Sequence, residues 1–191
     1  MSRDAFPSDP AGSKRLHVVQ GEFAVTEDPD VMMGTILGSC VAACIRDPVA
    51  GVGGMNHFLL PGDKEGAAAD TPNALRYGVQ SMELLLNALY RKGARRERLE
   101  VKLFGGARVI DGLSDIGQQN AAFAERFLQA EGIALMGGSL RGDQARRIQF
   151  WPVSGRVRQM ALVEPGKQVF EAERAKPAPA PVADDGDLEL F

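Results

Sequence analysis

Long apolar runs are missing from this sequence. None approaches the roughly 18 consecutive apolar residues that a membrane-spanning helix needs, and residues 1–12 have no apolar centre of the kind that marks a signal peptide. We therefore expect a cytoplasmic protein that does not insert directly into a membrane. The sequence also has no large excess of one charge: its net charge is −3 at pH 7, and residues 175–191 alone account for that −3. Because the remainder is near neutral, and the basic stretch 91–98 has no interleaved aromatic residues, we expect no nucleic-acid binding.

Cysteine and histidine are scarce, with two of each in the 191 residues. Cys40 and Cys44 lie only four residues apart, so they do not indicate a disulfide framework and fit a reducing compartment. Paired C-x-x-C knuckles, a phosphate-binding loop and a dinucleotide-binding glycine motif are all missing. Cys40, Cys44 and His57 could supply three zinc ligands, but a structural zinc site needs a fourth, and His17 is the one remaining histidine. We therefore expect no metal and no other cofactor.

A predicted hairpin brings a cysteine and a histidine together. Residues 40–46 favour a strand, 47–50 form a turn of the Asp-Pro type, and 51–60 return as a second strand. A four-residue turn pairs positions whose numbers add to 97, which places Cys40 directly opposite His57. Such neighbours have Cβ atoms roughly 4.5–5.5 Å apart, close enough for a sulfur–imidazole hydrogen bond. A slip of one residue would place the two side chains on opposite faces.

A thiol beside an imidazole can act as a nucleophile. A free thiol titrates near ~8.5, and a histidine partner lowers this to roughly 3.5–7.5; the imidazole can then pass a proton to a leaving group. Gly38 and Ser39 are small, so their backbone N–H groups and that of Cys40 could form an oxyanion site. The pattern by itself leaves a second interpretation open, in which Cys40 and His57 are a buried structural pair.

The segment LGSCVAACIRDPVAGVGGMNHFLLP, residues 37–61, closely resembles the signature of the chemoreceptor glutamine deamidase family (CheD). The later segments KLFGGA at 102–107, IGxxN at 116–120 and RRIQF with SGRV at 146–157 resemble further blocks of that family. The resemblance extends over about residues 16–163. It departs from the family at 139–142, Ser-Leu-Arg-Gly, where members more often have a glycine pair.

This resemblance implies a cysteine-dependent protein-glutamine deamidase. Cys40 would be the nucleophile, His57 the base and Thr35, the one threonine just upstream, the third member of the triad. The implied substrates are glutamine side chains of methyl-accepting chemotaxis receptors, and no cofactor is implied. An alternative of another class is a non-catalytic regulatory module that binds the receptors and a CheC-type response-regulator phosphatase.

The remaining pattern predicts an α+β fold, a layered core of mixed or antiparallel sheet with two principal helices, and the resemblance implies a cysteine-hydrolase, deamidase-like fold. We expect a flexible leader at 1–13, a deamidase domain at 14–171 and a disordered Pro/Ala-rich acidic tail at 172–191. Thr71 is the predicted N-cap and Gly93 the predicted end of the first helix. The predicted strands are 16–19, 22–25, 31–37, 99–104, 133–136, 146–153 and 155–163, and the predicted helices are 71–90 and 116–130.

Overall fold

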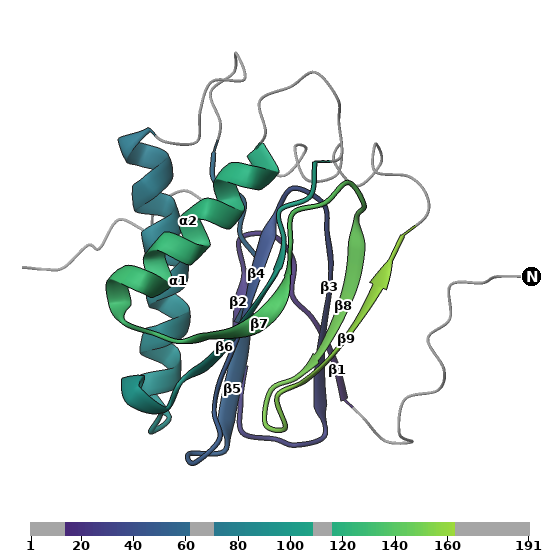
Figure 1. The fold of residues 1–191 in the computed structure, drawn as a ribbon. Coiled ribbons are helices and arrows are strands. Elements are labelled where there is room, and N and C mark those ends of the chain that lie inside the picture. The colour runs from purple at the N-terminus through teal and green to yellow at the C-terminus, as the bar shows by residue number, and fades with distance from the viewer. Residues whose placement is uncertain (1–13, 62–70, 109–115, 163–191) are drawn as a thin grey trace, which may run out of the picture.

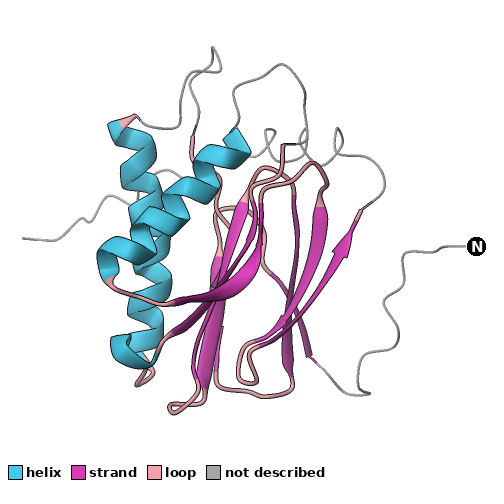
Figure 2. Ribbon diagram, in the orientation of Figure 1, coloured by secondary structure: helices cyan, strands magenta, loops and turns pink. Residues whose placement is uncertain are grey.

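The computed structural model describes residues 14–61, 71–108 and 116–162, which build three stacked layers (Figure 1). Two helices form one outer layer, a five-stranded sheet lies in the middle and a four-stranded sheet forms the other outer layer (Figure 2). This arrangement confirms the predicted α+β class and its two helices. The predicted leader and tail lie outside the described residues. In chain order the elements are β1 (Lys14–His17), β2 (Phe23–Thr26), β3 (Val31–Leu37), β4 (Val41–Asp47), β5 (Val52–Asn56), α1 (Pro72–Arg91), the 3₁₀ turn η1 (Arg96–Arg98), β6 (Glu100–Gly105), α2 (Ile116–Glu131), β7 (Leu135–Leu140), β8 (Arg146–Trp151) and β9 (Arg156–Ala161).

The two sheets are both mixed. The four-stranded sheet has the order β1-β3-β8-β9, and the five-stranded sheet has the order β2-β5-β4-β6-β7. In these sheets β1 pairs with β3, and β6 with β7, in parallel, while the other pairs are antiparallel. The chain therefore passes from one sheet to the other between β3 and β4. That crossing contains Gly38, Ser39 and Cys40.

Two apolar layers hold the three structural layers together. Both helices pack on the five-stranded sheet, and the second apolar layer fills the space between the sheets. Because successive side chains of a strand point to opposite faces, the alternation along β3 and β4 fixes which residues meet between the sheets. The inter-sheet layer contains Val18, Met33, Leu37, Cys40, Ala42, Cys44, Met55, Phe104, Ile148 and Phe150.

Helix α1 begins and ends where the sequence indicates. The Thr71 side chain accepts a hydrogen bond from the Ala74 N–H at 3.2 Å, and Pro72 occupies the first turn, where its missing N–H is not needed. At the other end Gly93 has a φ of +90°, a left-handed value that glycine adopts without strain. The apolar face of α1 is buried on the five-stranded sheet.

The sequence prediction for β7 is wrong in its limits. The predicted strand stops at Gly137, whereas the observed strand continues through Gly137 and Gly138 to Leu140. The two glycines are needed for close pairing with β6: a Cβ added to Gly138 would lie 1.9 Å from the Leu103 carbonyl oxygen. A Gly-Gly pair therefore marks close backbone approach within this strand rather than its end.

Candidate active site

The β4–β5 hairpin has a different register from the predicted one. Cα partners add to 99 rather than 97, so Asp47 pairs with Val52 and the turn is Pro48–Gly51. Two features cause this shift. Gly51 takes a left-handed φ of +68°, and the Asp47 carboxylate accepts the N–H groups of Val49 and Ala50 at 2.9 and 3.0 Å. Asp47 is therefore the last residue of β4, and its side chain caps the turn that follows; it is not the first residue of the turn.

This correction preserves the face but changes the pairing. A shift of two residues keeps Cys40 and His57 on the same face, toward the four-stranded sheet, but makes them diagonal rather than direct neighbours. Both are buried: Cys40 is 0% exposed and His57 is 5% exposed. The bridge between Val41 and Phe58, just inside them, carries the hairpin up to this position.

Thr35 and His57 meet across the two sheets. The Thr35 Oγ1 lies 2.9 Å from the His57 Nδ1, and the Val18 carbonyl oxygen lies 3.4 Å from the same nitrogen. Because a carbonyl oxygen can only accept, these neighbours favour the tautomer with the proton on Nδ1. That tautomer has its lone pair on Nε2, the nitrogen that can take a proton from a nucleophile.

The turn before β4 is held from behind at three successive carbonyl groups. The Gly38 oxygen accepts from the Ala107 N–H at 2.8 Å and the Cys40 oxygen from the Gly106 N–H at 2.7 Å. Between them, the Ser39 oxygen accepts from the Asn120 Nδ2 at 3.1 Å. In a planar trans peptide the N–H points opposite to the preceding carbonyl. The N–H groups of Ser39 and Cys40 therefore point away from β6 and α2.

Asn120 ends the IGxxN segment at 116–120, but the sequence analysis assigned it no role in this site. It is 0% exposed, and besides its bond to Ser39 its Oδ1 accepts the Leu60 N–H at 2.8 Å. One side chain of α2 thereby joins the backbone before β4 to the backbone after β5. The first turn of α2 comes close because of Gly117, where an added Cβ would lie 2.3 Å from the Ala107 carbonyl oxygen. The place of this asparagine in the IGxxN segment was the available signal.

Gln20 is the second residue that the sequence did not point to. It lies in the turn between β1 and β2, which the sequence indicates only as a break between two strands. The Cys40 thiol donates a hydrogen bond to the Gln20 Oε1 at 3.5 Å. Twenty residues separate the two groups in the chain, so no local pattern relates them.

The other thiol and the other histidine have different surroundings. Burial strongly raises the pKa of the Cys44 thiol, and the charge of Lys102 opposes this only in part, so Cys44 stays protonated at neutral pH. Tyr77 on α1 also has a raised pKa, because of its burial first and then because of the nearby Cys40. His17 lies on the exposed strand β1. Among residues 14–61, 71–108 and 116–162, no three His, Cys, Asp or Glu side chains are placed to hold a metal ion.

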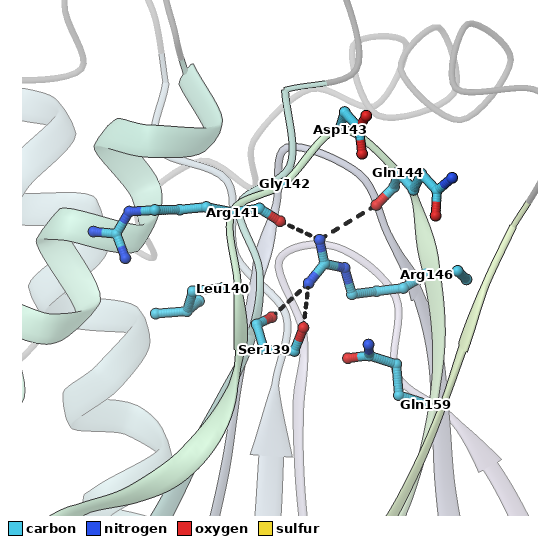
Figure 3. A pocket seen from close by; sticks show the side chains of 9 residues that line it. Ser139, Leu140, Arg141, Gly142, Asp143, Gln144, Arg146 and Gln159 are labelled. Carbon is cyan, nitrogen blue, oxygen red and sulfur yellow. Dashed lines mark hydrogen bonds between the residues drawn. The ribbon is translucent and has the colours of Figure 1, made fainter.

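A separate polar pocket of about 280 Å³ lies at the loop that joins β7 to β8 (Figure 3). Its floor is Arg146, whose guanidinium donates to Ser139 Oγ at 2.8 Å and to the carbonyl oxygens of Ser139, Arg141 and Gln144. The Arg141 side chain points the other way, toward α2, where it pairs with Glu125 at 2.6 Å. Arg141 has a φ of +70°, so it takes the left-handed position that glycine would occupy without strain. Arg146 therefore organises the loop backbone and is committed to its carbonyl groups.

A buried thiol, an imidazole in contact with a hydroxyl and a backbone turn fixed from behind lie together on an α+β scaffold, an arrangement typical of cysteine-nucleophile sites. The comparisons with known proteins agree with this class. The family model for CheD chemotactic sensory transduction matches residues 59–161. The chain is 55% identical over 191 residues, all of both chains, to the probable chemoreceptor glutamine deamidase CheD of Caulobacter sp. (strain K31). It is 58% identical over 183 residues, 95% of this chain and 98% of the other, to the protein of the same name from Agrobacterium fabrum (strain C58 / ATCC 33970). The chain belongs to the CheD family.

None of the helices in the described residues is long and apolar enough to cross a membrane.

Proposed function

We propose that this protein is a chemoreceptor glutamine deamidase that acts in the cytoplasm. It would convert glutamine side chains of methyl-accepting chemotaxis receptors to glutamate and release ammonia. The observation that carries this proposal is the 2.9 Å contact between Thr35 and His57, which orients an imidazole on the face that also bears Cys40. The relatives named above supply the class of substrate.

The first half of the reaction forms a covalent intermediate. His57 Nε2 takes the Cys40 proton, and the sulfur attacks the amide carbon of the substrate glutamine. The backbone N–H groups at Ser39 and Cys40, with Gly38 giving the turn its shape, are assigned to the negative charge that develops on the amide oxygen. His57 then returns the proton to the departing nitrogen. The products of this step are ammonia and a γ-glutamyl thioester on Cys40.

The second half releases the product. His57 takes a proton from water, the hydroxide attacks the thioester carbon and the Cys40 thiolate leaves with that proton. Thr35 keeps the imidazole in one tautomer through both halves, as the third group does in other nucleophile–base pairs. The reaction adds a carboxylate to the receptor and needs no cofactor.

The non-catalytic alternative is a module that binds the receptors and a CheC-type phosphatase. Such a module could lose its nucleophile without losing its fold. Cys40 and His57 are both present, and they share one face of the five-stranded sheet, which favours the enzyme. Association with a phosphatase remains compatible with the proposed activity.

Mass spectrometry of receptor cytoplasmic fragments tests the proposal. Incubation with the wild-type protein should convert particular glutamines to glutamate, a gain of about one dalton for each, with release of ammonia. Cys40→Ser should abolish this conversion without unfolding the protein. Cys44→Ala is the matched control, since it removes the other buried thiol, which lies in the same apolar layer between the sheets, and it should retain most activity. An active Cys40→Ser variant, or an inactive but folded Cys44→Ala variant, would contradict the assignment.

A further inference from the structure

The carboxamide of Gln20 lies against the sulfur of Cys40. The thiol donates to Gln20 Oε1 at 3.5 Å. The turn that carries Gln20 is hydrogen-bonded to the backbone of His57, the proposed general base. The Gly21 N–H donates to the His57 carbonyl oxygen at 2.7 Å, and the His57 N–H donates to the Glu22 carbonyl oxygen at 3.0 Å. Backbone hydrogen bonds of the two residues that follow Gln20 therefore hold this turn against His57.

Gln20 is more exposed than the sulfur that it contacts. Cys40 is 0% exposed, whereas Gln20 is only half-buried. Gln20 thus joins a fully buried sulfur to a partly exposed position in the turn between β1 and β2. A substrate glutamine that approaches Cys40 from the side of this turn would meet Gln20 first.

We propose that the Gln20 carboxamide occupies the subsite of the substrate's glutamine carboxamide and must leave it before the reaction begins. This inference rests on the proposed function, because the two groups are then chemically identical, each a primary amide on a glutamine side chain. Gln20 presents its oxygen to the thiol. Attack would instead require the sulfur to reach the amide carbon while N–H donors hold the oxygen, so this orientation leaves Gln20 unprocessed.

The contact also protects the nucleophile. An acceptor oxygen beside the sulfur favours the protonated thiol over the thiolate, and the thiolate is the reactive form. A substrate glutamine can bind only to molecules in which Gln20 has left the subsite. Its apparent affinity is therefore the intrinsic affinity multiplied by the fraction of such molecules. Removal of the Gln20 side chain should therefore increase thiol reactivity and substrate affinity together.

Two measurements on the full chain test this proposal. In a Cys44→Ala background, iodoacetamide labelling at neutral pH reports on Cys40 alone. Gln20→Ala should increase the labelling rate about two- to tenfold, the factor that one neutral hydrogen bond contributes to an equilibrium. Gln20→Glu should decrease it, because a carboxylate opposes the thiolate. Val19→Ala, in the same turn, is the control and should change the rate less than twofold.

Steady-state kinetics on a receptor fragment gives the second measurement. Gln20→Ala should lower KM severalfold and leave kcat within about twofold, since the change acts before the chemical step. A kcat at least tenfold lower with unchanged labelling would overturn the proposal and make Gln20 a hydrogen-bond donor in the reaction. A one-dalton gain at Gln20 in the wild type, absent from Cys40→Ser, would also overturn it, because Gln20 would then be a substrate.

The inference and the proposed function fail in different ways. A wild type that releases no ammonia from receptor fragments would overturn the proposed function and the subsite assignment with it. An active wild type whose Gln20→Ala variant shows neither faster labelling nor a lower KM would overturn the subsite assignment alone.

Discussion

Thr35 contributes one hydroxyl to the site, and its role can be separated from its place in the core. Thr35→Val removes the hydroxyl that contacts His57 Nδ1 and keeps the branched shape of the side chain. We expect kcat to fall about 10- to 100-fold with little change in KM, part of what general acid–base catalysis contributes. Thr35→Ser restores the hydroxyl and should remain within a few fold of the wild type. Ammonia release from a receptor fragment measures both, and equal activity of the two variants would contradict the orienting role.

At the residue scale, the sequence indicates roles for groups that share one local motif and misses the roles of groups that only folding brings near. Cys40 and His57 fall in one short hairpin, so their common face follows from strand alternation. Gln20 and Asn120 reach the same place from a separate turn and from α2. Nothing local in the sequence relates a side chain to a backbone group 81 residues away, the separation of Asn120 from Ser39.

At the scale of single elements, α2 acts on the site through one side chain. Asn120→Asp keeps the shape and the acceptor for the Leu60 N–H, but a carboxylate cannot donate to the Ser39 oxygen. Because the Ser39 carbonyl sets the direction of the next N–H, we expect kcat to fall about 10- to 100-fold, less than the loss of a whole oxyanion donor.

A destabilised helix without this contact is the control for Asn120. Leu128→Ala, two turns further along α2, removes a buried side chain that is 2% exposed and should lower the free energy of unfolding by about 2–5 kcal/mol. Its kcat per folded molecule should stay near that of the wild type. Urea unfolding and ammonia release, measured on both variants, separate the two effects. Parallel losses of stability and kcat in Leu128→Ala would show that α2 acts through general stability.

The β4–β5 hairpin shows why register was the weakest part of the prediction. The Asp-Pro pair indicates a turn correctly, but whether Asp47 belongs to the turn or to the strand depends on its side-chain partners. Those partners include the Arg95 N–H at 2.9 Å and Arg98 at 2.7 Å, in the segment that follows α1. Contacts from a distant element thus act together with the local turn bonds in fixing this register, and local propensity alone could not supply them.

Asp47 should make stability depend on pH. Burial opposes ionisation of Asp47, but hydrogen bonds from the N–H groups of Ala50 and Arg95, from the Arg98 side chain and from the Val49 N–H outweigh it and lower its pKa. A lowered folded-state pKa means that the unfolded chain binds the proton more tightly. The stabilisation is therefore fully present above the ordinary carboxyl pKa, about 3.9, and is lost as the pH falls through the folded-state value.

Asp47→Asn tests this dependence. At pH 7 we expect a loss of about 1–3 kcal/mol in the free energy of unfolding, because an amide cannot satisfy all the donors that face the carboxylate. The difference from the wild type should shrink below pH 4. Asp28→Asn is the matched control, since Asp28 pairs with Lys14 at the surface and such pairs contribute little. Urea unfolding at pH 7 and pH 3.5 measures both variants, and a difference that does not change with pH would contradict the assignment.

At the scale of the whole molecule, the site lies at the junction of the two sheets. Thr35 lies in β3 of the four-stranded sheet, Cys40 lies in the segment between β3 and β4, and His57 directly follows β5 of the five-stranded sheet. The sequence predicts these strands and both helices closely, because each has a clear period and clear turn residues. It does not predict that β3 and β4 belong to different sheets, since alternation reports a face and not a partner.

The acidic segment at 172–191 is expected to act beyond the catalytic domain. It is rich in proline, alanine and aspartate, and its last four residues contain three large apolar side chains, Leu188, Leu190 and Phe191. This segment lies outside the described residues, and we expect its last apolar residues to dock weakly on a partner. A docking segment raises the effective concentration of an enzyme near its substrate without a new contact at the active site.

Truncation separates this role from a structural one. Removal of residues 175–191 should leave kcat/KM on a short receptor peptide within about twofold, because a docking segment adds effective concentration only where its partner is present. On assembled receptor arrays the same truncation should slow deamidation. A full-length variant with Leu188, Leu190 and Phe191 all changed to serine keeps the linker and its charge, so it should reproduce the loss on arrays if the apolar motif is responsible. An equal loss on peptide and arrays would instead make the segment structural, and no loss on either would make it a passive extension.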